Sequence, residues 1–214
     1  MKEIITTTLK PALLVTIVLL VICGLFYPLA LTGIGQLAFN HQANGSIITV
    51  NGKEVGSEHV GQQFTEPYFL KGRVSAYNYN TYTEEDLQID PETGEANYTG
   101  VASGGSNYGN SNPELQARVE ESINEFLAAN PGVKREDIPA DLMTASGSGL
   151  DPDISPASAE IQVPAVSKAS GIPEDELRQM IADNTEGKVL GIFGQDRVNV
   201  LKVNIEIAQK MGLL

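Results

Sequence analysis

The sequence is poor in the residue types that build redox and metal sites. It has no tryptophan, one cysteine and two histidines among 214 residues. Cys23 lies inside an apolar stretch, so the rest of the chain can form neither a disulfide nor a thiolate metal site. His41 and His59 are too few for a histidine-rich metal centre, and each is interpreted as a surface residue. We therefore predict no metal site.

Positive charge is also scarce, with 14 Lys and Arg residues against 27 Asp and Glu residues and a net charge of −13. This balance argues against nucleic-acid binding, because a polyanion would repel the chain. Sequence patterns of catalysis are missing too. No G-x-S-x-G or H-E-x-x-H string occurs, and Gly52-Lys53 and Gly187-Lys188 lack the other residues of a phosphate-binding P-loop. No catalytic residue is predicted.

One long segment has no charge at all. Between Pro11 and Asn40 no side chain is charged, and roughly 20 apolar residues suffice to cross a bilayer. We predict a cytoplasmic N-terminus at residues 1–10, a transmembrane helix at 11–38 bent or ended by Pro28, and an extracytoplasmic domain at 39–214. A cleaved signal peptide fits less well, because the apolar run is too long and no A-x-A site closes it.

The orientation follows from the few basic residues near the apolar segment. Lys2 and Lys10 precede it, and the next basic residue is Lys53. The positive-inside rule places the N-terminus in the cytoplasm and the domain outside the plasma (inner) membrane. The expected partner on this basis is membrane lipid.

The remainder predicts a small domain of the α/β (α+β) class. Residues 46–57 alternate around Asn51-Gly52, which is typical of a β-hairpin with a tight turn. Residues 77–100 are polar and acidic and predict a loop or insertion. Asn112-Pro113 and Ser155-Pro156 are helix start signals, the second helix being bent or split at Pro164 before Gly171.

Three more elements complete the prediction. Pro173 opens a helix with Leu177, Met180 and Ile181 on one face. Residues 188–193 are strand-like. Residues 198–211 fit either a strand with a register shift or a helix, and the helix fits slightly better.

Two Gly/Ser-rich loops stand out at residues 102–107 (ASGGSN) and 144–156 (TASGSGLDPDISP). Their backbone N–H groups could form anion-binding nests next to helix N-termini. The same residue types are also what turns and caps require, and this structural interpretation is favoured. The residues alone thus indicate a membrane-anchored domain of a kind that is more often an accessory subunit or binding module than an enzyme.

These loops belong to five strings that follow one another along almost the whole chain. They are YPLALTGIGQLAFNHQANGS (27–46), VGQQFTEPYFLKGRVSA (60–76), ASGGSNYGNSNPELQARV (102–119), DLMTASGSGLDPDISPASAEIQVP (141–164) and TEGKVLGIFGQDRVNVLKVN (185–204). Together they resemble the C subunit of the Kdp high-affinity potassium-transporting P-type ATPase. Against this family, residues 79–98 look inserted, and Ala165 and Asn184 replace residues common elsewhere.

The resemblance implies a non-catalytic accessory subunit, beside a potassium-binding A subunit and an ATP-hydrolysing B subunit. It implies a role in assembling or stabilising that complex, and the family's C subunit has been proposed as a catalytic chaperone that raises ATP affinity. The nucleotide-binding candidates carried over are Ser146, Gly147, Ser148, Gly149 and Gln162. No tightly bound cofactor is implied, and ATP would be met only through the complex.

Topology conflicts with that nucleotide role, because a loop outside the membrane cannot touch a nucleotide bound in the cytoplasm. An effect on ATP affinity would then require allosteric coupling through the membrane part. The alternative function is a stand-alone, membrane-anchored binding module or hydrolase, which would need convergent polar groups in a pocket.

Overall fold

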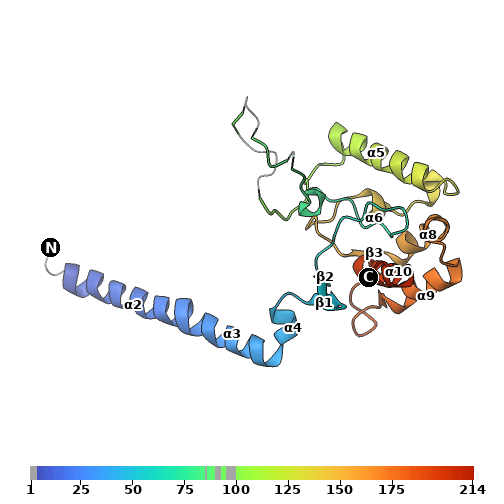
Figure 1. The fold of residues 1–214 in the computed structure, drawn as a ribbon. Helices are drawn as coiled ribbons and strands as arrows, with labels where there is room; N and C mark the ends of the chain where they lie inside the picture. Colours follow the sequence, from blue (N-terminus) through green and yellow to red (C-terminus); the bar gives the residue numbers. More distant parts are fainter. Residues whose placement is uncertain (1–3, 85, 90–92, 95–99) are drawn as a thin grey trace. The chain divides into compact units, whose positions relative to one another are not determined.

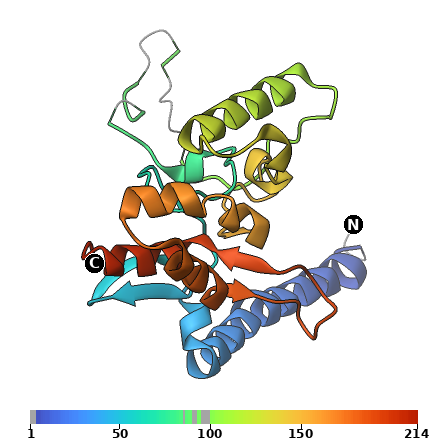
Figure 2. The same ribbon diagram turned by 90° about the vertical axis from the view of Figure 1, so that its right-hand side faces the viewer.

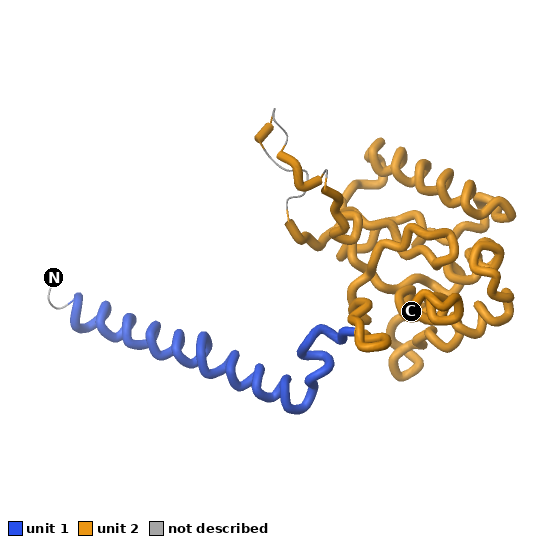
Figure 3. The backbone as a smooth tube through the Cα atoms, in the orientation of Figure 1, with its two compact units in different colours: residues 1–47 blue, residues 48–214 orange. Residues whose placement is uncertain are grey.

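The computed structural model describes residues 4–84, 86–89, 93–94 and 100–214. It divides into two compact units, residues 1–47 and residues 48–214, which Figure 3 colours separately. Each is described by itself. The expected acidic residues Glu85, Asp90, Glu92 and Glu95 of the 77–100 tract lie outside the described residues.

The first unit is one apolar helix followed by a short turn (Figure 1). The helix consists of a π-helical turn η1 (Ile5–Leu9), α2 (Lys10–Val21), a second π-helical turn η2 (Ile22–Phe26) and α3 (Tyr27–Ala38). It is long and apolar enough to cross a membrane. It begins before Pro11 and continues past Pro28, which occupies the first turn of α3 directly after the wider π-helical turn.

The helix end is held by side-chain amides. Phe39 leaves the helical conformation, and the short helix α4 (Asn40–Ala43) follows. Gln36 exchanges hydrogen bonds of 3.1 Å with the Asn44 amide in both directions and accepts another from Asn40 at 3.0 Å. These bonds fix the first turn after the apolar segment.

The second unit starts with the expected hairpin of β1 (Ile47–Val50) and β2 (Lys53–Ser57). Asn51 and Gly52 have φ angles of 51° and 78°, as a tight turn requires. A second, antiparallel sheet has the order β3–β5–β4 and consists of β3 (Asp153–Ile154), β5 (Arg197–Asn199) and β4 (Thr185–Glu186). In its register Val198 of β5 pairs with both Ile154 and Thr185.

The predicted helices form close to the expected bounds. They are α5 (Pro113–Ala129), α7 (Pro156–Glu160), α8 (Val163–Ser170), α9 (Glu174–Asp183) and α10 (Val200–Lys210), with the short α6 (Ala140–Met143) between α5 and β3. The Asn112 and Ser155 side chains cap α5 and α7 by accepting backbone N–H bonds. The helix is interrupted between α7 and α8, so Pro164 lies in the first turn of α8. A backbone N–H there has no partner within the helix, so proline loses no hydrogen bond. Two 3-10 turns, η3 (Asn78–Asn80) and η4 (Arg135–Asp137), complete the elements.

One aliphatic core unites the second unit. Val198, Val203 and Ile207 are completely buried, and the apolar faces of α5, α8 and α9 pack around them. Each such side chain contributes about 1.5–3 kcal/mol through burial. Figure 2 shows the helices and the sheet of this unit, with α5 at the end away from the β4–β5 turn.

Two expectations at the C-terminal end are settled. Residues 200–210 are helical, as favoured, but residues 197–199 pair first as β5. The predicted strand at 188–193 is wrong. A tight turn reverses the chain there, because Leu190 and Gly191 take positive φ angles of 55° and 71° and only Val189 and Phe193 pair.

Candidate functional site

The two Gly/Ser loops lie against each other and against the segment that follows the first sheet. We call residues 72–80, 102–107 and 144–151 the loop cluster. The Gly104 N–H donates to the Ser148 carbonyl at 2.7 Å, and the Ser103 hydroxyl donates to the same oxygen at 3.0 Å. The Ser75 hydroxyl donates to the Gly149 carbonyl at 2.6 Å. Three stretches far apart in sequence therefore form one surface.

The turn at residues 146–149 contains four of the five predicted nucleotide-binding residues. The Ser146 hydroxyl is buried and accepts the Gly149 N–H at 2.9 Å, while the Ser148 hydroxyl accepts the Leu150 N–H at 3.1 Å. Gly149 has a φ of 67°, and a Cβ there would lie 2.6 Å from the Gly104 carbonyl oxygen. Gly147 is exposed with open space around it. The buried half of this turn holds the loops together, and its exposed half faces outward.

The fifth predicted residue, Gln162, is not part of this turn. It lies directly before α8 and is 2% exposed. Its side-chain oxygen accepts the Lys71 N–H at 2.8 Å, and its nitrogen donates to the carbonyls of Lys71 and Ser158 at 3.2 and 2.9 Å. Both side-chain N–H donors are thus used within the protein.

Asn204 makes the same type of contact and was not predicted. This α10 side chain is 2% exposed, accepts the Leu70 N–H at 2.8 Å and donates to the Leu70 carbonyl at 2.9 Å. Two buried amides thus hold the main chain of consecutive residues, Leu70 and Lys71. No sequence signal marked Asn204, because its partner lies 134 positions away.

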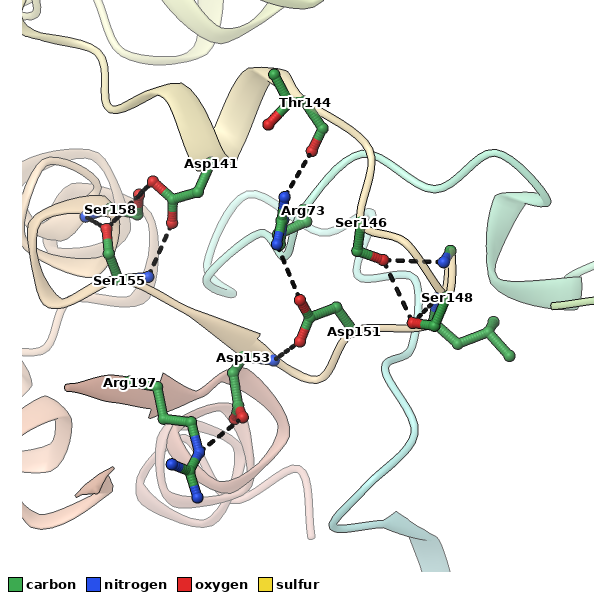
Figure 4. A network of polar contacts seen from close by, with 12 residues as sticks. Arg73, Asp141, Thr144, Ser146, Ser148, Asp151, Asp153, Ser155, Ser158 and Arg197 are labelled. Carbon is green, nitrogen blue, oxygen red and sulfur yellow. Dashed lines mark hydrogen bonds and ion pairs between the residues drawn. The ribbon is translucent and has the colours of Figure 1, made fainter. Parts of the chain in front are cut away.

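An ion pair within the loop cluster is linked by a further hydrogen bond to the three-stranded sheet (Figure 4). Arg73 donates to the Asp151 carboxylate at 3.0 Å and to the Thr144 carbonyl at 3.4 Å. The other Asp151 oxygen accepts the Asp153 N–H at 3.1 Å, and the Asp153 carboxylate lies 3.1 Å from Arg197 of β5. Burial raises the pKa of Asp153, the Arg197 guanidinium opposes that rise and the Asp151 carboxylate adds to it.

A second carboxylate fixes the start of α7. Asp141 accepts the Ser155 N–H at 2.8 Å and the Ser158 hydroxyl at 2.7 Å, both drawn in Figure 4. Burial alone would raise the pKa of Asp141, but these hydrogen bonds outweigh it and keep the pKa below its usual value. Asp141 therefore stays ionised and links α6 to the helix start.

The loop cluster contains a strained left-handed turn. Asn78, Tyr79 and Asn80 have φ angles of 47°, 53° and 56°. Left-handed backbone costs roughly 1–2 kcal/mol for each residue that has a Cβ. The turn is held because the Ser75 hydroxyl accepts the Tyr79 N–H, and the Asn80 amide bonds both main-chain groups of Ala102 at 2.9 and 3.1 Å.

Tyr79 connects this turn to the ion pair. Its hydroxyl donates to the Arg73 carbonyl at 2.6 Å, and its ring lies against Gly61. Burial raises the pKa of Tyr79 to about 12, the Asp151 carboxylate adds to the rise and the Arg73 guanidinium opposes it. The first residues of the 77–100 tract are thus part of the packed domain, which the polarity of that tract did not indicate.

The arrangement is better suited to recognition than to catalysis. The hydroxyls of Ser75, Ser103, Ser146 and Ser148 bond main-chain groups within the cluster. No group of three His, Cys, Asp or Glu residues suited to a metal ion occurs in the part of the chain that the structure describes. We call Ser103, Asn107, Gly147 and Ser148, four small or polar residues, the exposed edge of the cluster. Ala76, Tyr77, Asn78 and Thr144 of the cluster are exposed as well.

Comparison with known proteins assigns the family. The model of the KdpC family, described as the K+-transporting ATPase c chain, matches residues 9–209. The chain belongs to the KdpC family.

Similar relatives carry the same name. Subunits named potassium-transporting ATPase KdpC subunit are 63% identical in Clostridioides difficile (strain 630), 55% in Clostridium kluyveri and 45% in Caldanaerobacter subterraneus subsp. tengcongensis. These alignments cover 97%, 96% and 95% of this chain, and 99%, 95% and 95% of the relatives. The resemblance inferred from the five strings is thus confirmed.

Proposed function

We propose that the chain is a non-catalytic, single-pass accessory subunit that assembles and stabilises a potassium-transporting ATPase in the plasma membrane. The observation that carries this proposal is the apolar helix Ile5–Ala38, none of which is buried within the chain. A helix of this length and hydropathy needs lipid or other membrane helices as its surroundings. Relatives in the same family are named as subunits of a potassium-transporting ATPase, and this supports such an ATPase as the complex that the chain joins.

The partners of this proposal are the potassium-binding A subunit and the ATP-hydrolysing B subunit. The basic residues Lys2 and Lys10 before the helix support a cytoplasmic N-terminus, with the second unit on the outer side. In that orientation, a chaperone effect on ATP affinity would be transmitted through the membrane helices, with no contact between the 146–149 turn and ATP.

We assign the exposed edge of the loop cluster to a subunit contact. Internal hydrogen bonds and the buried Gly149 give this edge a defined shape, and the strained turn at residues 78–80 suggests that the shape itself is needed. Small residues along the edge would let a partner approach the backbone closely. Gln162 has a structural role in this proposal, since both its donors are used internally.

The test uses affinity-tagged chain in membranes of potassium-starved cells that lack the native copy. Wild-type chain should co-purify with a P-type ATPase and a multi-span subunit, and potassium-stimulated ATP hydrolysis should be lost without it. Recovery of the chain alone, with an intact pump in its absence, would overturn the accessory role.

A pair of glycine variants tests the contact surface. Gly147 and Gly132 are both exposed and both have open space for a Cβ, so Gly147→Tyr and Gly132→Tyr should fold equally well. Only Gly147→Tyr should reduce co-purification. Equal recovery of both would exclude the edge as a contact, and labelling of the 146–149 turn by a photoreactive ATP analogue would restore the nucleotide role.

A further inference from the structure

The turn between β4 and β5 exposes an unusual concentration of apolar side chains. We call residues 189–193 the apolar tip. Val189, Leu190, Ile192 and Phe193 are 59%, 84%, 74% and 64% exposed. Elsewhere among the described residues of the second unit, at most two large exposed apolar side chains lie within five consecutive residues, as Leu87 and Ile89 or Leu213 and Leu214 do. A contiguous exposed apolar patch marks an interaction site.

The geometry of the apolar tip is fixed. Val189 and Phe193 exchange backbone hydrogen bonds of 2.9 and 3.0 Å, and the Ile192 N–H also donates to the Val189 carbonyl at 3.2 Å. Leu190 is held in the left-handed region at a φ of 55°, a conformation that a polar Asn or a Gly would adopt at lower cost. A large apolar residue in a strained, exposed position points to a role outside the fold of this chain.

Charge around the apolar tip differs from that of the rest of the domain. Residues 187–195 contain no carboxylate, and Lys188 is their one charged residue, although the whole chain has a net charge of −13 and the exposed Asp196 follows directly. At the base of the turn, the Glu186 carboxylate is paired with Arg197, and the Lys202 ammonium lies 3.8 Å from the same carboxylate. Residues 189–193 themselves therefore carry no carboxylate that anionic headgroups would repel, and the nearest charge in sequence is positive, at Lys188.

The position of the apolar tip within the second unit favours lipid as the occupant. Both Figure 1 and Figure 2 show the β4–β5 turn at the same end of this unit as the β1–β2 hairpin, and opposite to α5. β1 follows the apolar helix after residues 39–46, which even fully extended span about 30 Å. The chain that follows the apolar helix thus enters the second unit at the end that carries the apolar tip.

We propose that the apolar tip inserts into the lipid headgroup and acyl boundary, as a second membrane contact that orients the domain. Apolar side chains with a flanking lysine are the composition of interfacial segments, in which the lysine can reach the headgroups. This inference rests on the proposed membrane anchor, but it can fail while the anchor holds.

The experiment uses full-length chain reconstituted into phosphatidylcholine vesicles with or without brominated acyl chains. Cys23 is the one cysteine, so a fluorophore on the wild-type chain reports insertion of the apolar helix. A second chain, Cys23→Ala/Gln195→Cys, carries the fluorophore at an exposed polar residue beside the apolar tip and leaves its apolar residues intact. A third, Cys23→Ala/Val101→Cys, labels an exposed control residue.

We expect brominated lipid to quench the labels at Cys23 and Gln195 but not at Val101. Adding Leu190→Ser and Phe193→Ser to the Gln195-labelled chain should abolish its quenching. Quenching at Cys23 alone would overturn lipid insertion of the apolar tip while leaving the anchor intact. A Gln195 label that changes its emission only when the other ATPase subunits are added would assign the tip to a protein partner and also overturn the proposal. An unquenched Cys23 label would refute the anchor and, with it, this inference.

Discussion

Removing the Asn204 amide tests whether two buried amides hold the segment at residues 70–71 in place. Asn204→Ala takes away both partners of the Leu70 main chain, whose N–H and C=O lie 2.8 and 2.9 Å from the amide. Leu70 is 1% exposed, so water cannot replace either bond. Gln162→Ala removes the equivalent bonds to Lys71, which is only partly buried.

The magnitudes follow from this difference in burial. A buried main-chain group left without a partner costs about 1–3 kcal/mol, so the loss of two partners in Asn204→Ala should lower the free energy of unfolding by about 2–6 kcal/mol. Gln162→Ala should cost about 1–3 kcal/mol, because water reaches Lys71. Native stability is typically about 5–15 kcal/mol, so the first change is a large fraction of it. In a domain of this size, each kcal/mol lowers the Tm by roughly 2–4 °C.

The assay is urea unfolding of the full chain in mild detergent, followed by far-UV circular dichroism. Gln179→Ala is the matched control, because its exposed amide donates only to Asp183 on the same helix face and its loss should stay within about 0.5 kcal/mol. If Asn204→Ala changes the stability no more than this control does, the reasoning about buried amides is refuted. A stable Gln162→Ala chain with impaired nucleotide labelling would instead support the family's proposed role for Gln162.

Three further predictions concern the loop cluster and its surroundings. Gly149→Ala should destabilise the chain by more than about 2 kcal/mol in thermal unfolding, because the new Cβ would lie 2.6 Å from the Gly104 carbonyl oxygen and residue 149 has a positive φ. Gly147→Ala is the control and should leave the stability unchanged. Equal effects of the two substitutions would contradict the packing described. Asp141→Asn should cost about 1–3 kcal/mol at pH 7. The folded-state pKa of Asp141 is lowered, so its contribution is present above about pH 4 and lost as pH falls through the folded-state pKa; a difference from wild type that persists undiminished at pH 2 would refute this. The folded-state pKa of Tyr79 is raised to about 12, so the stability that its neutral hydroxyl contributes is lost as pH rises from about 10 to 12. Urea titration should show that wild-type chain loses this stability over that pH range and that Tyr79→Phe does not.

The sequence predicted those elements whose signals are local. Asn112 and Ser155 each cap a helix that begins with proline, and Asn51-Gly52 forms the hairpin turn, since caps and turns depend only on neighbouring residues. The same local reasoning failed at residues 188–193. A run of apolar residues indicates a strand when it is buried, and here it is an exposed turn.

The loop cluster was predictable in part. Its two Gly/Ser-rich stretches were recognised, and turn chemistry rather than an anion-binding nest was favoured for both. That they meet each other, through Gly104 and Ser148, could not be read from the sequence, because such contacts depend on tertiary packing. The left-handed turn at Tyr79 also escaped prediction, since a residue with a large side chain is seldom placed at a positive φ.

The five residues singled out by family resemblance therefore have three different physical roles. Ser146 and Gly149 join the loops from within, Gln162 clamps a neighbouring segment, and only Gly147 and Ser148 face outward. The sequence of such a motif can be distinctive because its buried residues are needed for folding. The exposed residues between them then form the contact surface. Because the buried members fix the position of the exposed ones, substitutions at the buried residues should reduce complex assembly only together with stability. Substitution at Gly147 should reduce assembly alone, and this separation distinguishes a contact residue from a structural one.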